Sequence, residues 1–77
     1  MQVQIMIFGQ LKDITGKSEL TLYDIPDTDT LIQTLQSLYP ALTKAKFAIA
    51  LNKKVISTNT SLEGDTNIAL LPPFSGG

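Results

Sequence analysis

The chain has 77 residues and a formal net charge of −1, enough for one domain whose thin core has little volume to spare for a deep active site. Without Cys or His it has no thiol nucleophile, no thiolate or imidazole metal ligand and no general base poised near neutral pH, so we expect no metal site. Its six lysines are scattered and it has no arginine, which argues against nucleic-acid binding.

The first segment, residues 1–8, lacks the basic start of a signal peptide, and Gln2 and Gln4 interrupt its apolar run. No segment approaches the ~20 apolar residues of a membrane span. We therefore expect a cytoplasmic protein with no membrane or nucleic-acid partner, whose function lies on a surface or at a terminus.

The first half of the chain predicts two strands and a helix. Val3, Ile5 and Ile7 alternate with Gln2, Gln4 and Met6, which predicts a half-buried strand over residues 2–8. Residues 18–23 predict a second strand after the loop 9–17. Thr28 is expected to cap a helix, because apolar residues then recur at helical spacing as far as Tyr39. Pro40 ends that helix.

The second half of the chain is rich in β-structure. Residues 47–51 and 55–57 predict two strands around a turn at 52–54, and residues 67–71 predict the last strand. This order predicts an α+β, β-grasp (ubiquitin-like) fold: a mixed sheet with one main helix across one face and a projecting C-terminal tail. The first and last strands are expected to be central and parallel. We assign residues 1–71 to this domain and residues 72–77 to the tail.

The tail reads Pro72-Pro73-Phe74-Ser75-Gly76-Gly77. Prolines cannot extend a β-ladder and favour an extended path of ~3.1 Å per residue, so six residues can reach roughly 18 Å. Glycine has no Cβ, which lets its main chain approach a partner's catalytic groups closely. The pattern is typical of a tail that delivers a terminal carboxylate into a narrow channel; a flexible terminus or a cloning remnant is the plainer alternative.

The tail and several internal motifs resemble the MoaD/ThiS family of sulfur carriers over nearly the whole chain. The similar segments are residues 8–16, Pro40, Ala50-Leu51-Asn52 and residues 62–65, and above all residues 71–77. The tail pattern, Pro-Pro-hydrophobe-small-Gly-Gly, is typical of the molybdopterin branch. Lys12-Asp13 stands where many members have Arg-Glu, which keeps the charge pattern but not a bidentate arginine contact.

The resemblance implies a non-catalytic carrier with no bound cofactor. An E1-like adenylyltransferase would use ATP to convert the Gly77 carboxylate to an acyl-adenylate, and a sulfur donor enzyme would turn it into a thiocarboxylate. The tail would insert into the large, catalytic subunit of molybdopterin synthase, in a heterotetramer of two small and two large subunits. Sulfur would then pass to a cyclic pterin precursor in molybdenum cofactor biosynthesis. The tail positions concerned are Pro72, Pro73, Phe74, Ser75 and Gly76.

Three alternatives stay open. A thiamine-pathway sulfur carrier shares fold and chemistry, although Pro72-Pro73 argues against it. A ubiquitin-like modifier joined to protein lysines through Gly77 shares the activation step. A binding module that never uses its terminus would be indifferent to the loss of Gly77.

Two hypotheses concern partner contacts. If Val3, Ile5 and Ile7 face the helix, the outer face of the sheet is apolar at the positions between and beside them, and we predict a partner interface there. Those positions are Met6, Phe8, Ala69 and Leu71. Phe74, a large aromatic residue on the tail, is predicted to anchor in a partner pocket.

Overall fold

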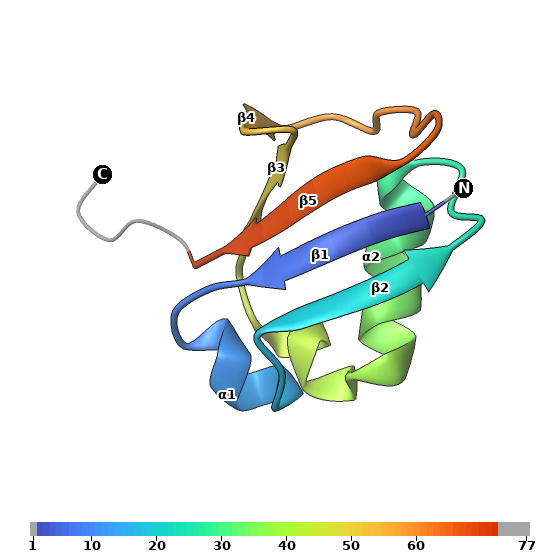
Figure 1. Ribbon diagram of the computed structural model, residues 1–77. Helices are drawn as coiled ribbons and strands as arrows, with labels where there is room; N and C mark the ends of the chain where they lie inside the picture. Colours follow the sequence, from blue (N-terminus) through green and yellow to red (C-terminus); the bar gives the residue numbers. More distant parts are fainter. Residues whose placement is uncertain (1, 73–77) are drawn as a thin grey trace.

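The computed structural model describes residues 2–72, which contain five strands, two α-helices and a 3₁₀ helix (Figure 1). In chain order these are β1 Gln2–Ile7, α1 Leu11–Thr15, β2 Glu19–Tyr23, α2 Thr28–Leu38, η1 Pro40–Lys44, β3 Ala48–Leu51, β4 Lys54–Ile56 and β5 Thr66–Leu71. Within this part of the chain, no helix has both the length and the apolar character needed to cross a membrane.

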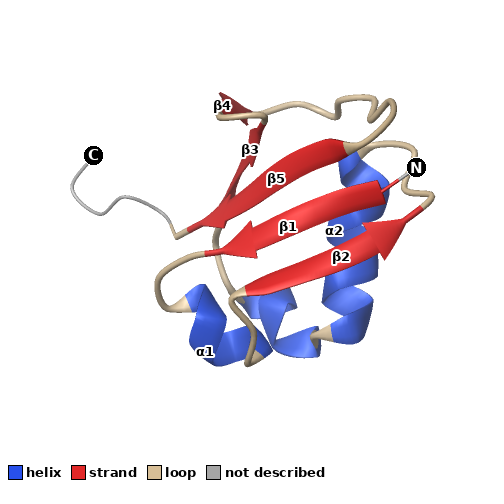
Figure 2. Ribbon diagram, viewed as in Figure 1, coloured by secondary structure: helices blue, strands red, loops and turns tan. Residues whose placement is uncertain are grey.

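The strands form one mixed sheet in the order β2-β1-β5-β3-β4, with α2 across one face (Figures 1 and 2). β1 and β5 are adjacent and parallel, with Ile5 opposite Ile68, whereas the other pairs are antiparallel. Both strands lie inside the sheet. The predicted β-grasp fold, with central and parallel first and last strands, is therefore confirmed.

The core lies between the sheet and α2. Alternate residues of a strand face the same side, so one face of β1 and β5 is buried while the residues between lie on the other face. From α2, Leu31 and Leu35 are one turn apart and fully buried against this face. The buried strand residues are Val3, Ile5, Ile7, Ile68 and Leu70.

The predicted cap of α2 is wrong by one residue. Thr28 is the first residue of the helix, and Asp27 is the cap: its Oδ1 accepts a hydrogen bond from the Thr30 N–H at 2.9 Å. Asn59 completes this end, because its Oδ1 accepts from the Asp29 N–H at 2.9 Å. Asp and Thr are both favoured N-cap residues, so the sequence alone did not show which of the neighbours Asp27 and Thr28 caps the helix. The helix ends at Leu38, before Pro40 as predicted.

The Asp27 cap is expected to make the stability of the fold depend on pH. Hydrogen bonds from the side chain and main chain of Thr30, and then from the Asn59 side chain, hold the pKa of the Asp27 carboxyl below its ordinary value. Such a carboxyl stabilises the fold above its unfolded-state pKa and loses that contribution as pH falls through the folded-state pKa. We expect the free energy of unfolding, measured in urea, to decrease as pH falls below about 4.

Asp27→Asn keeps a capping oxygen but does not titrate, so it should flatten this part of the pH curve. Asp29→Asn is the matched control, because it removes a carboxyl from the same helix end while the Asp27 cap remains. Equal slopes for the Asp27→Asn variant and the unmodified chain would assign the acid sensitivity to other carboxyls.

Two segments that we predicted to be loop or linker form short helices. α1 lies inside the predicted loop 9–17 and buries Leu11 fully; η1 lies in the predicted link after α2 and buries Leu42 fully. Five residues span little more than one turn, too few for a helical repeat to show in the sequence. The turn predicted at Thr15-Gly16 is the end of α1, where the Gly16 N–H donates to the Lys12 carbonyl at 2.7 Å.

Gly16→Ala is expected to lower the free energy of unfolding by about 1 kcal/mol. Gly16 has a φ of +74°, which alanine disfavours, but an added Cβ would meet no atom within 4 Å, so only backbone strain is introduced. The exposed neighbour Lys17→Ala serves as control and should change stability by less than about 0.5 kcal/mol. Urea denaturation of both variants tests this, and equal stabilities would show that the left-handed turn costs alanine nothing here.

The hairpin between β3 and β4 has a two-residue turn. Asn52 and Lys53 have φ values of +48° and +73°, as a tight hairpin turn of this type requires. The turn fixes the register, with Leu51 opposite Lys54 and Ala50 opposite Val55. The expected strands exist, and their ends differ by one residue: β3 begins at Ala48 rather than 47, β4 spans 54–56 rather than 55–57, and β5 begins at Thr66 rather than 67.

Candidate functional site

The outer face of the sheet, opposite α2, is polar at one end and apolar at the other. At the polar end, Gln4, Thr21 and Asn67 lie side by side, and the Thr21 hydroxyl donates to Gln4 Oε1 at 3.3 Å. At the other end, residues that lie opposite one another on β1, β5, β3 and β4 form a row across the sheet. A second row lies next to it. The first row is Met6, Ala69, Ala50 and Val55, and the second is Phe8, Leu71 and Ala48. We call these seven residues the apolar patch.

Several side chains of the apolar patch are open to solvent. Met6 and Phe8 are each 42% exposed and Val55 is 60% exposed, while Ala69 and Leu71 are half-buried. Neither Phe8 nor Leu71 is fully buried, and full burial of both would have argued against an interface here. The four predicted interface residues Met6, Phe8, Ala69 and Leu71 thus lie together, and their role in binding stays a prediction.

The chain leaves the sheet at the apolar patch. β5 ends at Leu71, and Pro72 packs against the loop after β1: a Cβ added to Gly9 would lie 2.8 Å from Pro72 Cγ. Gly9 has a φ of +61°, and the Phe8 N–H donates to the Leu70 carbonyl at 3.1 Å. The start of the predicted tail therefore lies beside Phe8. The predicted tail beyond Pro72 lies outside the described residues, so the predicted division into a domain and a tail stays a prediction. The positions concerned are Pro73, Phe74, Ser75, Gly76 and Gly77.

Sequence reasoning missed part of this site. Ala48, Ala50 and Val55 extend the apolar patch across β3 and β4, and Gly9 receives Pro72. The positions of Ala48, Ala50 and Val55 on the outer face could have been predicted from a two-residue turn at Asn52-Lys53, because that turn determines which residues of the hairpin share a face. The contact of Gly9 with Pro72 joins residues far apart in the sequence and had no local signal.

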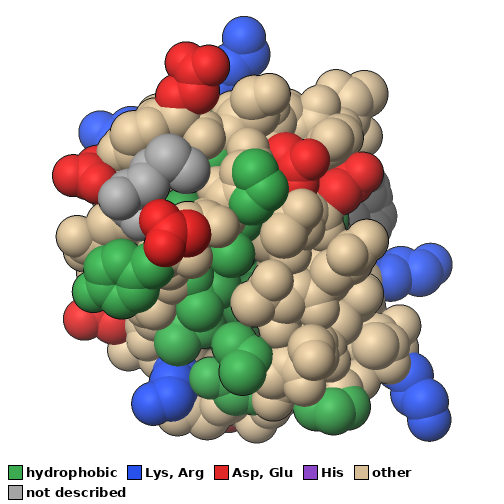
Figure 3. All heavy atoms as spheres, turned by 90° about the vertical axis from the view of Figure 1, so that its right-hand side faces the viewer, with side chains coloured by type: hydrophobic (Ala, Val, Ile, Leu, Met, Phe, Trp, Pro, Cys, Tyr) green, Lys and Arg blue, Asp and Glu red, His purple; other side chains and the backbone are tan. Residues whose placement is uncertain are grey.

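The opposite end of the molecule has a different surface. Figure 3 views it from the right-hand side of Figure 1, away from the end of β5. Hydrophobic side chains form a band there, with acidic side chains in the upper and left parts and lysines projecting around the rim. Among the described residues, the pKa of the Asp27 carboxyl is clearly lowered, and its capping hydrogen bonds explain the shift. The apolar patch is thus the candidate binding surface within the part of the chain that the structure describes.

The family model described as the ThiS family matches residues 5–77. The chain belongs to the ThiS family. This match extends through the Gly76-Gly77 end of the sequence, beyond the residues that the structure describes.

Individual proteins are similar to this chain over nearly their full lengths. A molybdopterin synthase sulfur carrier subunit from Dictyostelium discoideum is 33% identical over 84 residues, covering 99% of this chain and 96% of that protein. In a solved complex of subunits 1 and 2 of the molybdopterin-converting factor from Helicobacter pylori, one chain is 30% identical with a TM-score of 0.74, covering 100% of both chains. The small archaeal modifier protein 1 of Methanosarcina acetivorans is 26% identical with a TM-score of 0.82, covering 99% of this chain and 96% of that one.

Proposed function

We propose that this chain is the sulfur carrier subunit of a molybdopterin synthase and that Gly77 carries the sulfur as a thiocarboxylate. The observation that carries the proposal is that β5 ends at the apolar patch, where Pro72 packs against Gly9, and that the sequence after Pro72 ends in Gly76-Gly77. The Dictyostelium and Helicobacter relatives, which bear molybdopterin names, support the assignment of the pathway.

The proposed chemistry takes place on the main-chain terminus. A free carboxylate is a poor electrophile, so a separate adenylyltransferase joins the Gly77 carboxylate to the α-phosphate of ATP and releases pyrophosphate. A sulfur donor enzyme then supplies the sulfur that displaces AMP, leaving a thiocarboxylate. The absence of Cys and His from the sequence agrees with this division of labour, because the sulfur needs no side chain of the carrier.

The apolar patch is the proposed contact for the large, catalytic subunit. Its exposed apolar area lies where the tail leaves, so docking there would aim Gly77 into the large subunit's active site. We propose an assembly of two small and two large subunits in the cytoplasm. Sulfur then passes to a cyclic pterin precursor, and the carrier returns with a carboxylate.

Reconstitution tests this function. The chain is incubated with a molybdopterin adenylyltransferase, ATP and a sulfur donor, and then with the large synthase subunit and the cyclic pterin precursor. We expect formation of molybdopterin that requires every component. Sulfur loading without any transfer to the pterin, but with transfer to the acceptor of the thiamine pathway, would replace the proposed pathway with its closest rival.

Phe74→Ala is expected to weaken binding to the large subunit by about 2 kcal/mol, the usual range for a buried aromatic anchor. Phe74 follows the two prolines of the predicted tail. From the sequence, we expect a residue in this position to lie outside the hydrophobic core of its own domain. Stability in urea should stay within about 0.5 kcal/mol of the unmodified chain. Calorimetric titration gives the affinity, and a large loss of stability with unchanged affinity would show that Phe74 packs on its own domain.

A second candidate function is protein modification, favoured by the similarity to the small archaeal modifier protein 1. The same acyl-adenylate can be attacked by a lysine amine, which would join Gly77 to another protein by an isopeptide bond. Mass spectrometry of tryptic lysine peptides, in cells that express the chain with and without Gly77, distinguishes the two. Gly77-dependent conjugates on specific lysines would establish this second function beside or in place of the first.

A further inference from the structure

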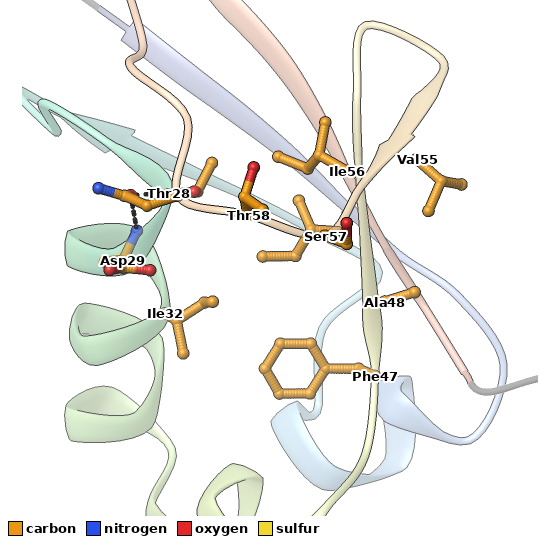
Figure 4. Close-up of a pocket in the computed structure, with 11 residues that line it drawn as sticks. Thr28, Asp29, Ile32, Phe47, Ala48, Val55, Ile56, Ser57 and Thr58 are labelled. Carbon is orange, nitrogen blue, oxygen red and sulfur yellow. Dashed lines mark hydrogen bonds between the residues drawn. The ribbon is translucent and has the colours of Figure 1, made fainter.

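A groove of about 410 Å³ lies between α2 and the β3–β4 hairpin, well separated in sequence from the tail (Figure 4). Ile32 of α2 and Phe47, next to β3, point toward each other across it, and Ile56 of β4 lines it from above. Asp29, Thr58 and Asn59 add polar groups at the end near the start of α2. The groove therefore has an apolar floor that could accept one or two side chains.

The wall of the groove formed by β4 is the free edge of the sheet. β4 is the last strand in the order β2-β1-β5-β3-β4, and within residues 2–72 it pairs only with β3. Val55 also lines the groove, although its side chain points away from it in Figure 4, on the outer face. Val55 thus contributes its main chain to the groove.

The hydrogen-bond register shows which way that main chain faces. The Asn52 N–H donates to the Asn67 carbonyl at 2.8 Å, so along β3 the main chain of Ala50, two residues earlier, also faces β5. Ala50 and its opposite residue Val55 are then a non-hydrogen-bonded pair of the β3–β4 ladder. The Val55 N–H and carbonyl consequently point outward, to the open edge.

Charge is divided unevenly along the chain. Residues 30–62 contain Lys44, Lys46, Lys53 and Lys54 and no Asp or Glu, a charge of +4; the remaining residues contain two lysines and seven acids, a charge of −5. One lysine pair lies just before β3 and the other in or beside the hairpin turn, so the two pairs flank the hairpin at both ends. Among the described residues that line the groove, Asp29 alone carries a carboxylate.

We propose that this groove binds an extended peptide segment of a partner protein, with acidic residues at both ends of an apolar centre. The peptide adds to β4 as a further strand and pairs with the Val55 N–H and carbonyl. One of its apolar side chains lies between Ile32 and Phe47, and its acidic residues lie near the two lysine pairs. The capped start of α2 offers no free N–H to an anion, because Asn59 and Asp27 accept from Asp29 and Thr30. This inference does not depend on Gly77.

The probe is a synthetic peptide, acetyl-EEVIVEE-amide, titrated into the isotope-labelled full chain and followed by NMR. We expect shifts in the amide signals of Val55 and Ser57 and slower hydrogen exchange at the Val55 N–H. The matched peptides acetyl-KKVIVKK-amide and acetyl-EESGSEE-amide test charge and the apolar centre, and both should bind at least about tenfold more weakly. Binding of the acidic peptide should weaken as salt is added.

Variants of the chain separate the contributions. Val55→Pro removes an N–H that the β3–β4 ladder does not use, so it should preserve the fold, as circular dichroism can check, and weaken the peptide about tenfold. Val55→Ala keeps the N–H and should bind as the unmodified chain does. Lys53→Glu combined with Lys54→Glu should weaken binding, and Asp29→Asn should strengthen it.

Several results would overturn the proposal. These are equal binding of the acidic and basic peptides, shifts confined to the apolar-patch residues of β1 and β5 with none at Val55 or Ser57, or no shifts at millimolar peptide. Unchanged affinity in both the Val55→Pro and the lysine-reversal variants would do the same. The lysines would then serve only to keep a short edge strand from pairing with other chains.

Discussion

One alanine added after Gly77 is expected to reduce the rate of adenylate formation at least about 100-fold. The added residue moves the reacting carboxylate one residue further along the tail, and misplacement by ~1 Å can already cost 10²-fold. It also gives the terminal residue a Cβ where glycine has none. Pyrophosphate release in the presence of the adenylyltransferase and ATP measures the rate.

The control is one alanine added before Met1. The first strand begins at the end of the sheet opposite the end of β5, so this addition changes chain length and mass equally, far from the tail exit (Figure 1). It should react at the rate of the unmodified chain. If the chain extended after Gly77 is adenylated as fast as this control, activation does not occur at the terminal carboxylate.

Ala69→Asp is expected to weaken the complex with the large subunit at least about 100-fold. Ala69 lies in the middle of the apolar patch, between Met6 on β1 and Ala50 on β3. Docking of a partner on this face would bury the new carboxylate without a counter-charge, at a cost of about 3–5 kcal/mol. Because Ala69 lies outside the core between sheet and α2, the variant should fold.

Asn67→Asp is the matched control for this variant. Asn67 lies on the same strand and the same face, two residues earlier, at the polar end of the outer face. It introduces the same charge with almost no change in shape and should affect binding little. Equal losses for the two variants would mean that net charge, and not the apolar patch, governs the complex; no loss for Ala69→Asp would place the interface elsewhere.

The fold was predictable where burial repeats regularly along the chain. Val3, Ile5 and Ile7 alternate over a whole strand, and Leu31 and Leu35 recur at one helical turn, so periodicity identified β1 and α2. α1 and η1 were not predicted, because each has only five residues and buries one apolar side chain fully, Leu11 or Leu42. A segment of little more than one turn shows no hydrophobic period in the sequence.

The candidate site was predictable in part, for a similar reason. Met6 and Ala69 follow from the alternation of two strands that pair in the sheet centre. The place of Ala50 and Val55 in the apolar patch can be predicted only when the register of the β3–β4 hairpin is known. In addition, an alanine is too small to indicate a binding face by itself. The groove that joins Ile32 to Phe47 depends on how α2 sits over β3, a long-range arrangement that no local pattern predicts.

The central claim, that Gly77 carries the sulfur, is tested most directly by intact-protein mass spectrometry. The chain is incubated with an adenylyltransferase, ATP and a sulfur donor, and is then fragmented to locate any added mass. The account predicts a gain that matches one oxygen exchanged for sulfur, on Gly77 alone. An unchanged mass under conditions that load a known ThiS-family carrier, or sulfur located on any other residue, would contradict it.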